Sequence, residues 1–294
     1  MSLNSQKILG IRVTTSSKQS ILEYIKKYLA LGVENRAPGR EKLGKSFVIV
    51  TPNPEQIVLA QTNLAFRDIF NRADVALPDG VGVSLAAKFL GIKYHGAGVM
   101  KDIERIPGVE FMEDLVQLAA DRGYTIGLIG GKQGLAVRAL ECLQARYPRL
   151  EGWAFEPGQV SLGNLGDLSD LGEKIRKTNT RFVFVGLGAP KQEYFIERLV
   201  REMSLRSGLP EKQSRRDRHV PQSGTRDDHK AVIFMSVGGA FDMISGSIQR
   251  APVFIRSVGM EWLWRLFQEP WRWRRQLALL KFVFLVFREK IRTR

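Results

Sequence analysis

Short apolar runs alternate with longer amphipathic stretches along most of the chain. The runs typical of buried strands are SFVIV (46–50), VAL (75–77), YTIGLI (124–129), RFVFV (181–185) and AVIFMSV (231–237). Helical periodicity follows them, at 54–73, 81–91, 108–115, 132–147 and 190–203. This alternation predicts βαβ units, and therefore an α/β fold with a mostly parallel sheet flanked by helices. The turns after the strands share the carboxyl edge, where such sheets bind ligands.

Two segments depart from this alternation. Residues 204–230 are polar and mixed in charge, which predicts a mobile insertion between a helix and the last strand. From Arg250 onward, arginines interleave with tryptophan and phenylalanine. We therefore divide the chain into an α/β domain at 1–249 and a basic, aromatic-rich C-terminal appendage at 250–294.

Composition adds a strong positive charge to this picture. The 294 residues are 44% hydrophobic and 26% charged, as in ordinary globular proteins, but the formal net charge is +15. More than half of that excess lies from Arg250 on, where eleven Lys and Arg residues face three Glu residues. The charge predicts anionic partners, namely nucleic acid, nucleotide phosphates or an acidic membrane surface.

The sequence gives little support for a disulfide, a zinc site, a signal peptide or a membrane span. The single cysteine, Cys142, excludes an internal disulfide, and the three scattered histidines form no zinc-ligand spacing. The N-terminus has no long apolar run, so we expect no signal peptide. No segment reaches the roughly 18 to 20 apolar residues of a membrane span.

Three glycine-bearing turns follow predicted strands. They contain Gly130 and Gly131, then Gly186 and Gly188, and finally Gly238 and Gly239. Glycines at such turns let a backbone approach phosphate groups at a helix N-terminus, but they also permit tight packing of strand against helix. Neither alternative is favoured for a single turn. Three turns at one edge favour a nucleotide-type ligand, although none is a full dinucleotide fingerprint or P-loop.

Two further stretches place polar side chains at the same edge. Lys191, Gln192 and Glu193 crowd a predicted helix start after Pro190, which indicates either ligand binding or a solvated first turn. Asp79, in VALPDGVGV, ends a strand where a helix begins. Local chemistry favours an N-cap role for Asp79, whereas its place at the ligand edge favours a catalytic base.

The appendage has three interpretations. It is a core helix with surface arginines, a nucleic-acid surface of arginines and stacking aromatics, or an interfacial membrane helix. The run LALLKFVFLVF (277–287) is apolar nearly all round, and this favours membrane contact.

Several motifs in order along the chain point to one family. They are TPNPEQ (51–56), ADVALPDGVGV (73–83), ERIPGVEFM (104–112), FVGLGAPKQE (184–193), GGAFDMISGSIQRAPVFIR (238–256) and MEWLWRLFQEPWRWRRQ (260–276). Together they resemble the WecG/TagA/CpsF glycosyltransferases, or glycosyltransferase family 26. The resemblance covers most of the chain.

The resemblance implies a Rossmann-like fold with a helical appendage that docks on the membrane. It implies a hexosyltransferase that moves a sugar from a UDP-sugar to a polyprenyl-diphosphate-linked saccharide, with inversion and without metal or other cofactor. It places the protein in the cytoplasm, peripheral on the inner face of the plasma membrane, in cell-surface polysaccharide synthesis. Expected partners are both substrates and an anionic membrane, not nucleic acid; a homo-oligomer remains an alternative to a monomer.

The resemblance also assigns residues. Asp79 corresponds to the catalytic base, Arg105 to a pocket arginine and Gln192 to a glutamine near the sugar. Thr51 and Asn53 line the acceptor side. Arginines of the appendage close over the diphosphate, and these are Arg265, Arg272 and Arg275. They share one face only if a helix continues across Pro270.

The glycine turns and the adjoining helix start complete the expected substrate site, which comprises Gly130, Gly131, Gly186, Gly188, Lys191 and Glu193. About eight residues near HGAGVMKD (95–102) depart from the family pattern as an insertion. The donor sugar stays open among N-acetylmannosamine, its uronic acid, glucuronic acid and glucose. The competing alternatives are a nonenzymatic basic nucleotide- or nucleic-acid-binding protein and a membrane scaffold with an inactive site.

Overall fold

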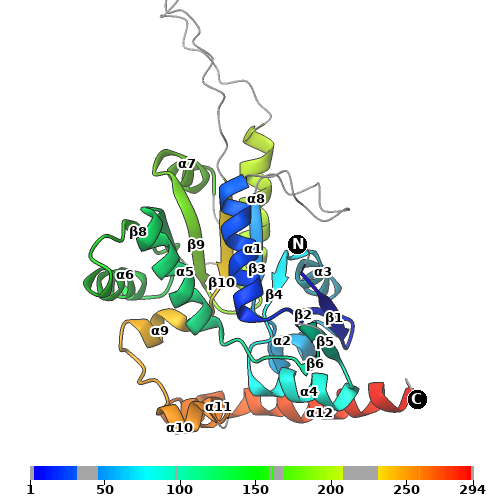
Figure 1. The fold of residues 1–294 in the computed structure, drawn as a ribbon. Helices are drawn as coiled ribbons and strands as arrows, with labels where there is room; N and C mark the ends of the chain where they lie inside the picture. The colour runs from blue at the N-terminus through cyan, green and yellow to red at the C-terminus, as the bar shows by residue number, and fades with distance from the viewer. Residues whose placement is uncertain are drawn as a thin grey trace, which may run out of the picture.

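A six-stranded parallel sheet forms the centre of the protein, in a computed structural model that describes residues 3–31, 46–96, 99–158, 161, 168–207, 231–257 and 259–292 (Figure 1). The strand order is β4-β3-β10-β9-β7-β8. These strands span Val75–Ala76, Ser46–Val50, Val232–Ser236, Thr180–Gly186, Thr125–Gly130 and Gly152–Phe155, respectively. The expectation of an α/β fold with a parallel sheet flanked by helices is confirmed.

The first and last strands of this sheet, β3 and β10, pair with each other near its centre. From β3 the chain runs outward to β4, crosses to β7 and β8, and returns through β9 to β10. The turns after β3, β9 and β10 therefore lie beside one another. This is the switch point where open parallel sheets leave a crevice for a ligand.

Helices cover both faces of the sheet. The long ones are α1 (Lys18–Leu31), α5 (Gly108–Arg122), α6 (Leu135–Arg146), α8 (Lys191–Ser207) and α12 (Trp273–Arg292). Shorter helices are α2 (Pro54–Leu59), α3 (Leu64–Arg72), α4 (Val81–Leu90), α7 (Ser169–Lys177), α9 (Ala240–Ile244), α10 (Val253–Ser257) and α11 (Glu261–Gln268). Two antiparallel hairpins flank them, β1–β2 (Ser5–Ile8, Ile11–Thr14) and β5–β6 (Lys93–Gly96, Val99–Asp102); the second contains most of the HGAGVMKD insertion.

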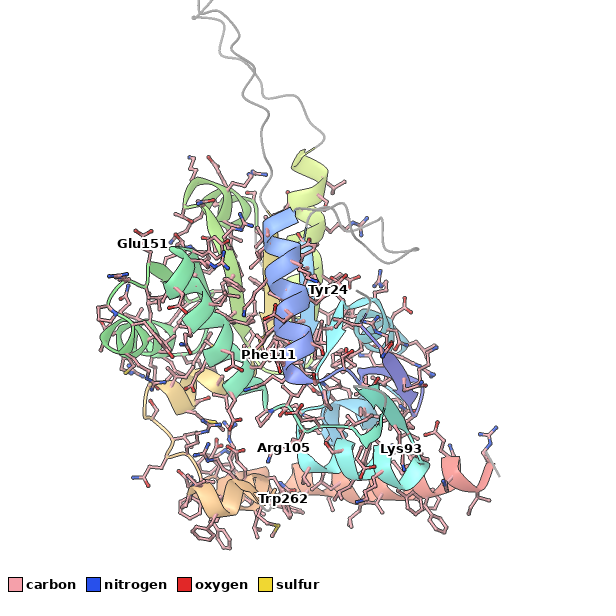
Figure 2. All side chains as sticks on the ribbon, viewed as in Figure 1. Tyr24, Lys93, Arg105, Phe111, Glu151 and Trp262 are labelled. Carbon is pink, nitrogen blue, oxygen red and sulfur yellow. The ribbon has the colours of Figure 1, made fainter. Side chains whose placement is uncertain are left out.

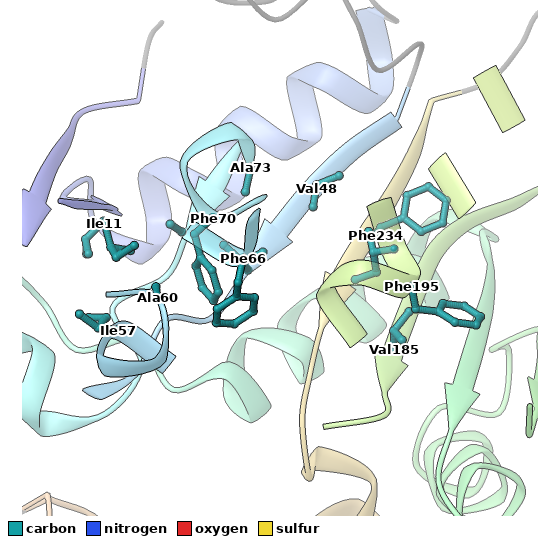
Figure 3. Close-up of a cluster of buried hydrophobic side chains, with 14 of the residues drawn as sticks. Ile11, Val48, Ile57, Ala60, Phe66, Phe70, Ala73, Val185, Phe195 and Phe234 are labelled. Atoms are coloured by element: carbon teal, nitrogen blue, oxygen red, sulfur yellow. The ribbon is translucent and has the colours of Figure 1, made fainter. Parts of the chain in front are cut away.

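Alternate residues of the strands enter two separate cores. Phe47 and Ile49 of β3 pack with α1, α5 and α6, whereas Val48 and Val50 pack with α2, α3, α8 and α12. Figure 3 shows the second core, in which Phe66 and Phe70 of α3 form an edge-to-face pair with ring centroids 4.7 Å apart. Because both faces of the sheet are covered, the strands read as continuous apolar runs in the sequence.

The expected helix at 54–73 is wrong as a single element. It divides into α2 and α3, because the Asn63 side chain accepts a hydrogen bond from the Phe66 backbone N–H and caps a new helix. Pro54 does stand at the first position of α2, as predicted. Pro190, in contrast, precedes α8, which begins at Lys191.

The appendage packs closely against the α/β domain. Phe282, Leu285 and Val286 of α12 are buried in the core that contains Val50. At the far end of this helix, Glu289 accepts a hydrogen bond from the Leu9 backbone N–H at 3.0 Å. The division at residue 249 stays a prediction, and α12 contributes to the same core as β3.

Two expectations concern the insertion at 204–230 and the appendage helix across Pro270. Helix α8 continues through Ser207, so residues 204–207 of the expected insertion are helical, and 208–230 lie outside the described residues. The appendage helix is not continuous across Pro270, because α11 ends at Gln268 and a 3₁₀ turn (Pro270–Arg272) precedes α12. Proline cannot donate the backbone hydrogen bond that a continuous helix would need there.

Candidate active site

Three loops meet at the carboxyl edge around Asp79. The Asp79 backbone N–H donates to Pro52 in the loop after β3, at 3.3 Å. The Ile106 backbone N–H, in the loop before α5, donates to Pro78 at 3.1 Å. Segments that lie far apart in the sequence thus surround one carboxylate.

Asp79 does not cap the helix that follows it. Gly80 is the N-cap of α4, and no side chain in the described part of the chain caps that helix. The Asp79 Oδ1 atom instead accepts a hydrogen bond from the Gly108 backbone N–H at 3.3 Å, at the start of α5. The N-cap interpretation from the sequence is therefore wrong for α4, and the Asp79 carboxylate faces the loop that carries Arg105.

The surroundings of Asp79 favour a proton acceptor that works near neutral pH. Burial raises the pKa of Asp79 to about 6, against the opposing influence of the Gly108 N–H and the Arg105 charge, and the negative charge of Glu261 raises it further. The side chain is nevertheless partly accessible. A carboxylate with this pKa is ionised at neutral pH and still basic enough to accept a proton.

Arg105 connects the α/β domain to the appendage. Its Nη2 donates to Glu261 Oε2 at 2.9 Å, and its Nη1 donates to the Arg256 carbonyl at 3.1 Å. Figure 2 shows Arg105 between the sheet and the layer of helices that carries Trp262. The structure thus brings Arg105 and Asp79 together at one edge.

Gln192 and Glu193 are buried at the start of α8, so a solvated first turn is wrong for these two residues. Gln192 Nε2 donates to Glu193 Oε1 at 2.7 Å, and Gln192 Oε1 accepts from the Gly238 backbone N–H at 3.0 Å. Gln56 Nε2 donates to the same Glu193 oxygen at 3.4 Å. The polar cluster therefore ties together the turns after β3, β9 and β10.

Burial raises the pKa of Glu193 to about 7, while its hydrogen bond from Gln192 acts in the opposite direction. The folded protein therefore binds a proton that the unfolded chain releases near its ordinary pKa of 4.5. The contribution of Glu193 to stability is full below pH 4.5 and is lost as the pH rises through about 7, by about 3 kcal/mol if Glu193 acts alone. Asp79, whose pKa is raised to about 6, causes a decline of the same sign that ends near pH 6. We expect Glu193→Gln to make the decline shallower and to abolish the part between about pH 6 and pH 7, measured by urea unfolding across the interval.

Glu197→Gln is the matched control for that experiment. Glu197 lies on α8, as Glu193 does, and pairs with Arg72 of α3 at the surface. Loss of this surface pair is expected to change stability by less than about 1 kcal/mol. The control is expected to keep the wild-type decline of stability with pH. If Glu193→Gln and wild type lost stability equally between about pH 6 and pH 7, another group would cause the decline in that interval.

The glycine turns separate into two kinds. A Cβ on Gly130 would lie 2.5 Å from the Gly186 carbonyl oxygen, and one on Gly186 would lie 2.8 Å from the Phe241 ring. Tight packing therefore accounts for these two glycines. Gly188 and Gly238 have positive φ angles, and among the described residues a Cβ there would contact nothing within 4 Å. These two positions leave the backbone open to a ligand.

Thr51 and Asn53, expected at the acceptor side, belong to the loop after β3 that meets the Asp79 turn. The Thr51 methyl group would contact a Cβ on Gly108 at 3.0 Å, and the Thr51 hydroxyl donates to the Ser236 carbonyl at 3.3 Å. Asn53 caps α2, with its side-chain oxygen accepting from the Gln56 N–H. Lys191 is half-buried at the start of α8, and Gly131 follows β7 at the same edge. Substrate contacts of these residues stay predictions.

Arg265 of α11 lies over the turn after β10. A Cβ on Gly239 would lie 2.5 Å from its Nη2 atom, and its Nε donates to Glu269 at 2.8 Å. Its Nη2 also lies 3.8 Å from Asp242. The side chains of Arg272 and Arg275 lie outside the described residues. Of the three expected arginines, Arg265 is the one that the structure places at the sheet edge.

The described ranges contain neither a cluster of metal-ligand side chains nor a membrane-spanning helix. There, no three His, Cys, Asp or Glu side chains gather in a way that could hold a metal ion. Metal independence stays a prediction. Nor, within those ranges, does any helix combine the length and apolar content needed to cross a bilayer.

The fold and the site define a Rossmann-like α/β enzyme, with a carboxylate and arginines at the ligand edge of its sheet. The chain belongs to the glycosyl transferase WecG/TagA/CpsF family, whose model matches residues 6–209 and 218–294. The expected family and a sugar-transferring enzyme of the hexosyltransferase type are confirmed. This favours the enzymatic interpretation over a nonenzymatic binding protein.

Two curated relatives carry the same name, N-acetylglucosaminyldiphosphoundecaprenol N-acetyl-beta-D-mannosaminyltransferase. The protein of Bacillus spizizenii is 28% identical over 247 residues, which cover 84% of this chain and 80% of the relative. The protein of Bacillus subtilis is 25% identical over 288 residues, which cover 98% and 93%, respectively.

Several residues of the site were not predicted from the sequence. Glu261, Glu110, Arg250 and Arg256 form ion pairs around Arg105, and Gln56 supports Glu193. Gln56 carried a local signal, since it completes a capping box with Asn53. The ion-pair cluster carried none, because its members join segments about 150 residues apart.

Proposed function

We propose that this protein is an inverting glycosyltransferase, which moves a sugar from a UDP-sugar to a polyprenyl-diphosphate-linked saccharide without a metal ion. The observation that carries the proposal is Asp79, a carboxylate of raised pKa at the ligand edge, held by Gly108 and close to Arg105. The printed names of the two relatives support a polyprenyl-linked acceptor. They also favour N-acetylmannosamine among the candidate donor sugars.

The proposed reaction is a single displacement at the anomeric carbon. The acceptor hydroxyl oxygen forms a bond to that carbon while the bond to the UDP oxygen breaks, and the bonding electron pair leaves with UDP. Asp79 accepts the hydroxyl proton as the new bond forms. Negative charge develops on the diphosphate, and Arg265 at the Gly239 turn supplies a guanidinium that suits phosphate oxygens.

The first experiment measures UDP release by the purified protein. A panel of UDP-sugars is tested with EDTA present, with and without a polyprenyl-diphosphate-linked N-acetylglucosamine in vesicles. Acceptor-dependent release from UDP-N-acetylmannosamine is the expected result. If the protein bound UDP but released UDP from none of the donors, this result would contradict the proposed transfer.

The same proposal includes docking on an anionic membrane from its cytoplasmic side. One stripe of α12 faces outward, with Trp273, Leu277, Leu280, Phe284, Phe287 and Ile291 at helical spacing, each more than half exposed. Leu85 and Phe89 of α4 extend this stripe, and Phe89 stacks on Phe287 with ring centroids 6.2 Å apart. Figure 1 shows α4, α10, α11 and α12 in one layer below the sheet.

The charge of this layer suits anionic lipid. Lys281 and Arg288 are exposed on α12, and Lys290 lies over the Phe89 ring at 6.0 Å. Aromatic and aliphatic side chains with lysine and arginine beside them are the composition of helices that lie in a membrane interface. The cytoplasmic leaflet carries the negative surface potential that attracts such helices.

We expect Leu280→Glu combined with Phe284→Glu to weaken binding to vesicles of anionic phospholipid by roughly tenfold or more, because two apolar groups would no longer enter the interface. Co-sedimentation measures the loss. Both side chains are exposed, so the melting temperature is expected to stay near wild type. Leu205→Glu, an exposed leucine on α8, is the matched control. Equal vesicle binding by all three proteins would contradict docking through α12.

A further inference from the structure

A glutamate of the appendage occupies the centre of the ion-pair cluster around Arg105. Glu261 is the first residue of α11, and its side chain is 15% exposed. One carboxylate oxygen, Oε2, accepts from Arg105 Nη2 at 2.9 Å, and the other, Oε1, lies 3.8 Å from Arg250 Nε. Glu110 of α5 neutralises the far side of the cluster, at 2.8 Å from Arg250 and 3.3 Å from Arg256.

The appendage holds Arg105 on two sides. The Arg105 guanidinium donates to the Glu261 side chain and to the Arg256 carbonyl, and both acceptors belong to the appendage. The position of this arginine beside Asp79 therefore depends on α10 and α11, although Arg105 itself belongs to the α/β domain.

The backbone brings the same segment against the Asp79 turn. A Cβ on Gly259 would lie 2.7 Å from Val81, which is two residues after Asp79 and opens α4. Gly259 also has a φ of +75°, a conformation that suits glycine, and it stands two residues before Glu261. Close contact here brings the start of α11 against the turn that carries Asp79.

We propose that Glu261 is a positioning residue, which holds Arg105 beside Asp79 and adds a negative charge to the Asp79 site when the appendage is docked. This inference rests on the proposed function, in which Asp79 accepts the proton of the acceptor hydroxyl. It makes the basicity of Asp79 depend on a segment that also carries the proposed membrane surface. If the appendage left the α/β domain, Asp79 would become a weaker base and Arg105 would lose both of its appendage acceptors.

The charges that face Asp79 explain why a second carboxylate helps. Arg105 and the N–H groups of Gly108 and Gly80 lower the pKa of Asp79, while burial and the Glu261 charge raise it. Arg105 without its partner would therefore make Asp79 more acidic. A general base is most effective when its pKa lies near the working pH. Glu261 counteracts the lowering of the Asp79 pKa that Arg105 causes.

The test is Glu261→Gln in the full chain, read in two ways. A carbon-13 NMR titration follows the Asp79 carboxyl, whose signal is assigned as the one missing from Asp79→Asn. We expect its midpoint to fall below the wild-type value of about 6. The pH profile of kcat/KM is expected to show the same downward shift of its acid limb. At neutral pH, kcat/KM is expected to fall on the order of tenfold.

The control is Glu289→Gln, which removes the hydrogen bond between α12 and the Leu9 N–H and lies in the same appendage. Loss of a merely structural contact lowers activity by one factor at every pH, so this variant is expected to keep the wild-type acid limb and Asp79 midpoint. Should Glu261→Gln lack the wild-type circular dichroism spectrum, Glu261→Asp carries the test. It keeps the charge one methylene farther from Arg105, and a smaller downward shift is expected.

An Asp79 midpoint that is the same in wild type and in the Glu261 variants would overturn the inference. This failure is distinct from failure of the proposed function, because the NMR titration reads the carboxyl itself and needs no turnover. UDP release by Asp79→Asn tests separately whether Asp79 is the catalytic base.

Discussion

Asp79→Asn is expected to lose acceptor-dependent transfer by roughly 10²- to 10⁴-fold while UDP-sugar binding stays at the wild-type level. The amide keeps an oxygen for the Gly108 N–H, so the loops around residue 79 have no reason to move. What disappears is the proton acceptor, and general base catalysis contributes on this scale. UDP release gives the rate, and isothermal titration calorimetry gives the donor affinity.

The wild-type pH profile supplies a second reading of the same residue. Because Asp79 must be ionised to accept a proton, kcat/KM is expected to fall as the pH drops through about 6. The residual activity of Asp79→Asn should lack this limb. Asp68→Asn, an exposed aspartate on α3, is the matched control and is expected to behave as wild type. Wild-type turnover in Asp79→Asn would remove the base assignment.

Arg265→Gln is the substitution with the second-largest expected effect. The guanidinium lies over the Gly239 turn, 3.8 Å from Asp242, and its buried Nη2 has no hydrogen-bond partner among the described residues. A pre-positioned cation of this kind stabilises charge that develops on the leaving diphosphate, and loss of one such group costs on the order of 10²- to 10³-fold in rate. We expect a loss of that size in kcat for UDP release.

Arg288→Gln is the control for charge alone. Arg288 is an exposed arginine on α12, so the two variants have the same net charge. The control is expected to keep kcat within about twofold, with at most weaker vesicle binding. If both variants lost kcat equally, Arg265 would act through the membrane and not at the diphosphate.

The order of strands and helices could be predicted because both faces of the sheet are covered. β3, β7, β9 and β10 are buried along their whole length or nearly so, and such strands appear as unbroken apolar runs. The location of Asp79 followed from the rule that strand ends share one edge. The hairpins and β8 were missed, because four-residue strands at a margin leave only a short pattern. Helices α1 and α7 were missed as well.

The contacts of the site could be predicted less well. Nothing near Asp79 in the sequence indicates that its carboxylate accepts from Gly108, or that Glu261 holds Arg105 from 156 residues away. In α12, apolar residues lie on nearly every side. Its sequence therefore does not tell which stripe, that of Phe282 or that of Phe284, packs against the protein.

The docking of α12 has a consequence for synthesis of the protein. Its inner residues Phe282 and Val286 pack against a core built from strands that leave the ribosome much earlier, and Glu289 meets Leu9 near the start of the chain. Contacts between such distant positions form late. Until α12 has been synthesised, the surfaces of α2 and α4 that contact it are exposed, and we expect a chaperone or the membrane to bind them.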